Sequence, residues 1–306
     1  MTNTGFRFAL SVAAIAASAI FSSGSATLAQ AAEVQNTPEI VGKRIVIAGR
    51  QRMLAEAMAK SVCYLKTGVD TEDSLRDLYV TWNTYGWYHR GLRLGNVQLE
   101  LFEEKHRRVQ RKWSDVDDAW SPMSKLHVSV LEGNDLSDVQ FVQMITLTEH
   151  MVGLSNELVS ELRSSYAKDI GKTGRLSALL IDLYERERML AQKLAKAVCL
   201  IDYGYETEAT RAELKKTLGF FNASIEAFLD GAPSVSIPPA PTPEMRAQLA
   251  SAKSHWDGIR HIATAVAEGG NPTADDMLLF RDQMDQFLSD MTMSINMLVE
   301  FEANKT

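Results

Sequence analysis

Two arginines, Arg52 and Arg188, are the residues best suited to hold a ligand. Each begins the run Arg-Met-Leu-Ala, and small residues continue along its helical face. These small residues are Ala48, Ala55, Ala59 and Cys63 for the first arginine, and Ala191, Ala195 and Cys199 for the second. Small side chains let another helix come close, and a guanidinium then offers five fixed donors to a confined space. If the two arginines converge, a nitrate-sized anion or a carboxylate would relieve their repulsion.

A second interpretation of these arginines needs no ligand. Both could pair with acidic residues of the fold, such as Glu56, or be solvated, and the residue pattern leaves this choice open. The neighbouring arginines Arg50 and Arg186 lie about 200° around the helix from the first pair, at 100° per residue. We therefore assign them to a different face, open to solvent, and not to the same pocket.

The two cysteines of the chain, Cys63 and Cys199, occupy matching places at the ends of these faces. A disulfide needs Cα atoms within about 7 Å of each other, and an alanine-rich face allows parallel helices to come that near. We favour an intrachain disulfide between them. Two buried free thiols that pack as small hydrophobic groups, and bridges between chains, are the alternatives that stay open.

Metal and catalytic chemistry have little support. Glu103 and His106 form one Glu-x-x-His step, which supplies iron ligands in ferritin-like bundles, but the second half of the chain has no matching step. The cysteine spacing fits neither a zinc knuckle nor a c-type haem. No serine, histidine and aspartate constellation stands out. We predict a protein with no metal site, no cofactor and no catalytic centre.

Aromatic residues are concentrated in the first half of the chain. They are Trp82, Tyr85, Trp87, Tyr88, Trp113 and Trp120. Their helical spacing is typical of a core, although an exposed remainder could instead be a docking surface for a partner.

All of these residues belong to an internal repeat. The run from Arg50 to Cys63 matches the run from Arg186 to Cys199 at a constant spacing of 136 residues. Without a gap, the same spacing pairs Gly68 with Gly204, Trp120 with Trp256, and Ser137 with Thr273. Two copies of one module therefore make up most of the chain. We place them at residues 32–170 and 171–306.

Each copy is predicted to contain four helices. The first spans about 39–66 in copy one and 174–202 in copy two, because apolar residues recur with the spacing of one helical face. Gly68 and Gly204 are expected to end these helices, Thr71 and Thr207 to cap the second pair, and Ser137 and Thr273 to cap the fourth pair.

The third helix is expected to differ between the copies. It covers about 97–132 in copy one, but it begins only after Pro243 in copy two, because the proline-rich stretch before it cannot continue a helix. Four amphipathic helices with short connections indicate an all-α fold. We predict two tandem four-helix up-and-down bundles that form a pseudo-twofold pair.

The N-terminal residues and the charge indicate a secreted, acidic protein. Residues 1–31 carry Arg7, an apolar run over 8–21 and the sequence Ala29-Gln30-Ala31, which is the layout of a cleaved signal peptide. Serines interrupt the apolar run too often for a membrane anchor. We expect a soluble periplasmic protein that does not span the membrane when mature. Cleavage makes the net charge of −7 one unit more negative, which argues against nucleic acid as a partner.

The run from Ile45 to Lys60, IVIAGRQRMLAEAMAK, resembles the opening helix of the periplasmic input domain of type IV pilus methyl-accepting chemotaxis transducers. It is more distantly similar to the input domain of nitrate/nitrite sensor kinases. Copy two keeps Arg-x-Arg-Met-Leu but has Glu185 in place of the glycine. In the sensor kinases an arginine of this helix holds a small anion where two bundles meet. The resemblance implies that role for Arg52 and Arg188.

From the resemblance we expect a periplasmic sensor-type protein that recognises a small anion, nitrate-like or a carboxylate. Because residues 32–306 contain no long apolar run, we expect it to act through a membrane partner, either a receptor or a sensor kinase. The alternative is a structural or adaptor protein of the cell envelope, associated with pili or chemotaxis, that binds no small ligand.

We predict that the mature protein begins near Ala32 and is recovered in the soluble periplasmic fraction, because the apolar run is short and a processing site follows it. N-terminal sequencing of the protein from that fraction measures the cleavage position. Recovery of a chain that starts at Met1 in the membrane fraction would contradict the prediction.

Overall fold

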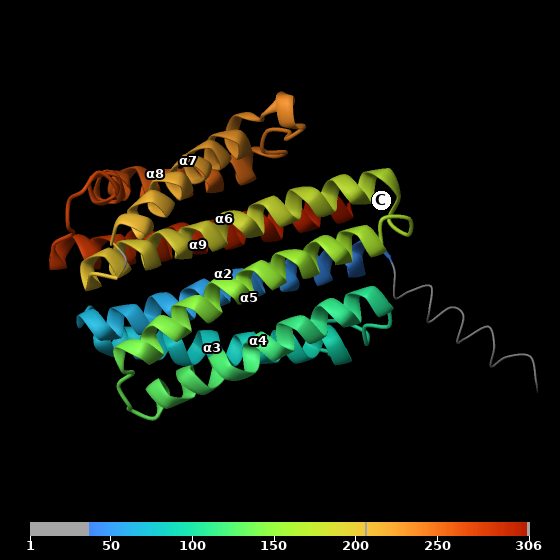
Figure 1. The fold of residues 1–306 in the computed structure, drawn as a ribbon. Helices are drawn as coiled ribbons and strands as arrows, with labels where there is room; N and C mark the ends of the chain where they lie inside the picture. Colours follow the sequence, from blue (N-terminus) through green and yellow to red (C-terminus); the bar gives the residue numbers. More distant parts are fainter. Residues whose placement is uncertain (1–36, 206, 305–306) are drawn as a thin grey trace, which may run out of the picture.

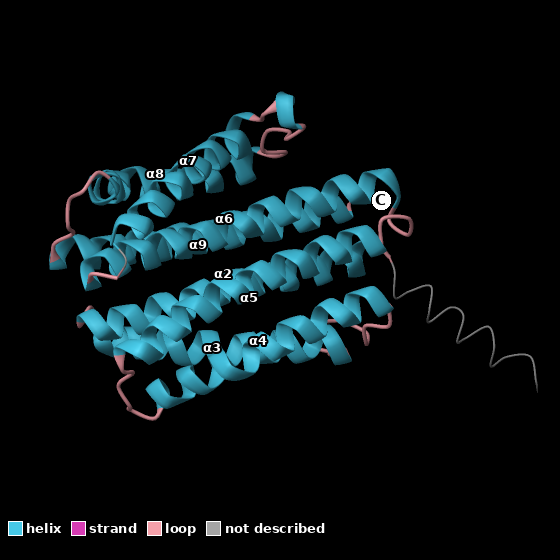
Figure 2. Ribbon diagram, in the orientation of Figure 1, coloured by secondary structure: helices cyan, strands magenta, loops and turns pink. Residues whose placement is uncertain are grey.

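The structure, a computed structural model, describes residues 37–205 and 207–304, apart from the side chain of residue 303. The signal peptide expected over residues 1–31 lies outside them. The described residues form eight α-helices, one short 3-10 helix and no β-strand (Figure 2). The prediction of an all-α fold of tandem bundles is therefore confirmed. None of the helices described is both long and apolar enough to cross a membrane.

Each bundle consists of four consecutive helices. The first bundle contains α2 (Pro38–Thr67), α3 (Thr71–Leu94), α4 (Arg107–Leu131) and α5 (Asp138–Ser165). The second contains α6 (Gly171–Tyr203), α7 (Thr207–Asp230), α8 (Pro243–Ala267) and α9 (Ala274–Ala303), with the 3-10 helix Pro233–Val235 between α7 and α8. Figure 1 shows them as stacked pairs, with α2 and α5 next to α6 and α9 in the middle.

Most of the expected helix ends are confirmed. Gly68 and Gly204 end α2 and α6 in the left-handed conformation, with φ of 74° and 83°, which glycine adopts at little cost. Ser137 and Thr273 both form capping boxes at the starts of α5 and α9. The prediction for Thr71 was wrong, because Asp70 caps α3 by accepting from the amide of Asp73. Both α3 and α7 begin at the threonine itself.

The third helix of copy one begins ten residues later than expected, at Arg107 rather than near residue 97. A loop precedes it, in which Asn96 and Leu101 form an antiparallel bridge, and Ala232 and Ile237 form the same bridge in copy two. The expected difference between the copies was therefore wrong. Both third helices begin at equivalent residues.

In copy one, buried polar contacts fix the loop that precedes α4. The corresponding loop of copy two contains prolines instead. The Arg44 guanidinium donates to the carbonyl oxygen of Phe102 at 2.6 Å and lies 3.3 Å from the Glu104 carboxylate. The Tyr166 hydroxyl donates to the same carboxylate at 2.7 Å. Because Arg44 and Glu104 are both buried, these contacts replace the water that the charged groups lose.

The aromatic residues of copy one lie mainly in the core of its bundle, as predicted. Tyr85 and Trp113 are buried, and Trp82 and Trp120 pack against the core. The Tyr85 ring stacks on Trp120 at a centroid distance of 4.2 Å. These rings join α3 to α4 across the bundle.

The bundles meet where α2 and α6 pack side by side (Figure 1). Residues at equivalent repeat positions face each other there, since Cys63 lies against Cys199 and Gly49 lies against Glu185. The two helices are therefore parallel and in register about a pseudo-twofold axis. α3 and α5 cover other sides of α2, so that every residue from Gln51 to Tyr64 is buried.

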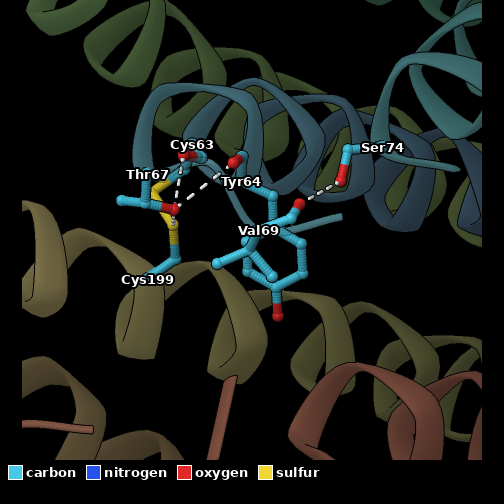
Figure 3. The surroundings of a disulfide bond; sticks show 6 residues. All are labelled: Cys63, Tyr64, Thr67, Val69, Ser74 and Cys199. Carbon is cyan, nitrogen blue, oxygen red and sulfur yellow. Dashed lines mark hydrogen bonds between the residues drawn. A yellow bond between two sulfur atoms is a disulfide. The ribbon is translucent and has the colours of Figure 1, made fainter. Parts of the chain in front are cut away.

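A disulfide joins the two helices near their C-terminal ends (Figure 3). The Cα atoms of Cys63 and Cys199 lie 6.2 Å apart, and both residues are fully buried. The Thr67 hydroxyl caps this region, because its oxygen lies 3.2 Å from the Cys63 carbonyl oxygen and 3.7 Å from the Cys199 sulfur. The bridge closes a loop of 136 residues.

We predict that the denatured, non-reduced protein contains no titratable thiol. Reduction should lower the free energy of unfolding by about 4–5 kcal/mol, because the bridge limits the unfolded chain. Thiol titration and urea unfolding with and without reductant measure both effects. The Cys63→Ser, Cys199→Ser double variant is the control, since reductant should leave its unfolding unchanged. Two thiols per non-reduced chain would contradict the prediction.

Candidate ligand site at the junction of the bundles

The junction of α2 and α6 buries Arg52 among polar partners from three helices. Its guanidinium is only 3% exposed. It donates to the Asp182 carboxylate at 2.7 Å, to the Asn156 side-chain oxygen at 3.0 Å and to the carbonyl oxygen of Gly49 at 3.3 Å. Every nitrogen of this side chain therefore has an acceptor.

Arg188 shares one carboxylate with Arg50. The Arg188 Nη1 atom donates to Glu185 at 2.9 Å, and the Arg50 Nε atom donates to the other oxygen of Glu185 at 3.3 Å. Glu185 is completely buried. Arg50 also donates to the Tyr88 hydroxyl at 3.2 Å. In contrast to Arg52, Arg188 keeps its buried Nε without an acceptor among the described residues.

The two arginines predicted from the sequence thus contact different carboxylates, Arg52 that of Asp182 and Arg188 that of Glu185, rather than facing one common space. Both arginines therefore pair with acidic residues of the fold. Glu56 is not one of these partners, since its carboxylate lies 2.7 Å from the ammonium of Lys196. Arg50 does lie on a different face of α2 from Arg52, but its exclusion from the site was wrong, because it shares Glu185 with Arg188. α2 is covered on several sides, so a second face of this helix also points into protein, and the Arg50 side chain is only 19% exposed. Arg186 is exposed.

The contact between Gly49 and Glu185 explains how this carboxylate reaches the junction. A Cβ atom added to Gly49 would lie 2.8 Å from the Cβ of Glu185 and 3.2 Å from the Arg52 guanidinium. Only glycine therefore leaves space for the glutamate at the equivalent repeat position. The sequence contained this signal, because the two residues are paired by the repeat, but it became a contact only when the copies packed about a twofold axis.

Positive charge exceeds negative charge at the junction. Arg163 also donates to Asp182, at 3.0 Å, so that four guanidiniums, those of Arg50, Arg52, Arg163 and Arg188, share the carboxylates of two residues. Burial lowers the pKa of the Arg188 guanidinium, and Glu185 opposes that effect.

Nothing in the described part of the chain gathers three or more metal-ligating side chains at one place. Glu103, of the Glu-x-x-His step, is exposed. Its neighbour Glu104 faces the interior and is held by Arg44 and Tyr166.

Comparison with known families identifies both bundles. The family model for the type IV pili methyl-accepting chemotaxis transducer N-terminal region matches residues 39–140 and 186–278, which together are more than half of the chain. The resemblance to this family, and its occurrence in two tandem copies, is therefore confirmed. No curated protein and no solved structure matches the chain at a significant level.

We predict that Gly49→Ala lowers the free energy of unfolding by about 1–3 kcal/mol, because the added methyl group overpacks the contact with Glu185. Gly153→Ala is the matched control. Gly153 lies in α5 with open space around its Cα, so alanine there should raise stability by up to about 1 kcal/mol through helix propensity. Urea unfolding measures both changes. If both variants shift the free energy of unfolding in the same direction, the close contact between Gly49 and Glu185 is contradicted.

Proposed function

The chain belongs to the family of type IV pili methyl-accepting chemotaxis transducer N-terminal domains, and we propose that it is a periplasmic sensor-type protein that binds one small anion at the junction of its two bundles. In this proposal the anion is nitrate, nitrite or a small carboxylate. The binding change passes to a membrane receptor or sensor kinase. The proposal assigns the chain no catalytic reaction.

The excess of guanidiniums around Asp182 and Glu185 carries this proposal. Four arginines share the carboxylates of two acidic residues, and two of these arginines, Arg52 and Arg188, are buried. The Arg188 Nε atom adds a buried donor without an acceptor. An unsatisfied donor on a charged group is costly in a protein interior. A small anion supplies both an acceptor and a negative charge, through hydrogen bonds that the cation strengthens.

The location suits a signal as well as a binding event. α2 and α6 belong to different bundles, and Glu185 is the carboxylate that both Arg50 and Arg188 contact. An anion that accepts from Arg188 would weaken the contact of Arg188 with Glu185 and leave this carboxylate more fully to Arg50. Ligand binding would then alter the relative position of the bundles on the side of the junction away from the disulfide.

A structural or adaptor role in the envelope is the second candidate. The observation that favours it is that Arg50, Arg52 and Arg188 each already contact a carboxylate. In that case the junction is a set of internal ion pairs that fixes how the bundles pack, and no small ligand is needed.

Calorimetry with sodium nitrate, sodium nitrite and sodium acetate separates the two candidates. We expect one binding site per chain for at least one of these anions. Arg52→Ala and Arg188→Ala should each weaken its binding by about 1.5–3 kcal/mol, the range for hydrogen bonds to charged groups, which is about 10- to 150-fold. Arg186→Ala removes an exposed arginine from the same helix and should leave the affinity unchanged.

Loss of folding has to be distinguished from loss of the site. Arg188→Lys keeps the charge but not the Nε donor, and its thermal unfolding without anion reports whether the junction is intact. The proposal fails if no anion binds the wild-type protein, or if affinity is unchanged in both alanine variants. Either result would leave the adaptor role as the better account.

A further inference from the structure

A second polar pocket lies between the bundles, further along α2. It has a volume of about 210 Å³ and is bordered by residues of α2, α3, α6 and α9. The charged and polar residues that line it include Lys60, Ser61, Asp77, Gln192 and Asp285. Lys60 is eight residues beyond Arg52, or about 12 Å along the helix. None of the arginines described above lines this pocket.

Several polar groups of the pocket have a distant partner or none among the described residues. Lys60 is only 4% exposed, and its ammonium lies 3.7 Å from the Asp285 carboxylate, which is beyond hydrogen-bond length. The Ser61 hydroxyl and the Gln192 side-chain oxygen are buried without a hydrogen-bond partner among the described residues. Both residues are more than nine-tenths buried. Burial raises the pKa of the Asp77 carboxyl, and Lys60 opposes that effect.

At the equivalent place in the other half of the repeat, both charged groups have an opposite charge within 3 Å. There the Lys193 ammonium lies 2.6 Å from the carboxylate of Glu213, which is the counterpart of Asp77. The Lys196 ammonium, the counterpart of Lys60, lies 2.7 Å from the carboxylate of Glu56. Copy two therefore satisfies its acid with an internal ammonium, and its buried lysine with an internal carboxylate.

Two substitutions remove both of these internal groups from the pocket. Ala57 stands at the repeat position of Lys193, and Gln192 stands at the position of Glu56. Asp77 thus lacks the close ammonium that its counterpart Glu213 has, and Lys60 keeps only the long 3.7 Å ion pair with Asp285. A third difference adds a donor, since Ser61 replaces the alanine at position 197. The two missing groups, one ammonium and one carboxylate, are the two charged groups of a free amino acid.

We propose that this pocket binds a small free α-amino acid as its zwitterion. The ligand ammonium pairs with Asp77 and donates to the Gln192 side-chain oxygen. The ligand carboxylate accepts from the Lys60 ammonium and the Ser61 hydroxyl. Ala57 borders the space left for the ligand side chain. The volume of about 210 Å³ suits a ligand as small as glycine or alanine.

The site is independent of the anion proposed at the arginine junction. It uses different residues and needs both charges on one ligand. A site built around two buried partners rejects analogues that leave one of them unpaired. We expect calorimetry to show one site per chain for glycine or L-alanine, and at least tenfold weaker binding of ethylamine and of propionate, which each carry one of the two charges.

Substitutions within the pocket give the second test. Lys60→Met and Asp77→Asn should each weaken L-alanine binding at least tenfold. Lys216→Met is the control, because this exposed lysine lies at the repeat position of Val80 in copy two and should leave the affinity unchanged. Melting temperatures without ligand show whether each variant is folded.

Exchanging residues between the two repeat copies should remove the site from one copy or create it in the other. Ala57→Lys with Gln192→Glu restores the internal ammonium and carboxylate and should abolish binding. Lys193→Ala and Glu56→Gln, combined with Ala197→Ser to supply the equivalent of Ser61, remove them from copy two and should raise the stoichiometry from one to two. The second set of changes tests the proposal even if the first pair fails to fold.

The inference is overturned if neither glycine nor L-alanine binds the wild-type protein, if ethylamine or propionate binds as tightly as L-alanine, or if a folded Ala57→Lys, Gln192→Glu variant keeps its affinity. Binding of nitrate together with no binding of amino acids would overturn this inference while leaving the anion proposal intact.

Discussion

The close, parallel contact between α2 and α6 is the constraint on which the rest of the structure depends. Alanines at positions 55, 59, 191 and 195 are almost fully buried, and together with Gly49 they let the two helices approach. The approach covers α2 on the side that its own bundle leaves open. Charged residues of α2 are consequently removed from water, and each must find its counter-charge inside the protein or in a ligand.

The repeat turns this constraint into a source of asymmetry. Equivalent residues meet across the pseudo-twofold axis, so a difference between the copies changes both sides of one contact. Glu185 opposite Gly49 brings a carboxylate to the arginines. Gln192 opposite Glu56 leaves one buried lysine 2.7 Å from a carboxylate and the other, Lys60, 3.7 Å from that of Asp285. Two identical copies would have given two identical sites, whereas the substitutions leave a different polar environment at each.

The disulfide and the arginine junction divide the contact into two regions with different freedom. Near Cys63 and Cys199 the helices are covalently tied and fully buried. The region around Glu185 is held by packing, ion pairs and hydrogen bonds, and a ligand with its own charge can rearrange the ion pairs. Relative movement of the bundles, in the function we propose, is therefore confined mainly to the part of α2 and α6 that precedes the disulfide.

The sequence by itself determined the repeat, the helical content and most helix ends, because these depend on neighbours within a few residues. Gly68 stops α2, and Ser137 caps α5, by local backbone geometry. Only the tertiary structure decided which charges meet. Helical periodicity on one helix placed Arg50 away from Arg52, yet Glu185 approaches Arg50 from the other bundle. Ion-pair partners depend on how separate helices pack, and a single helical face carries no information about what lies opposite it.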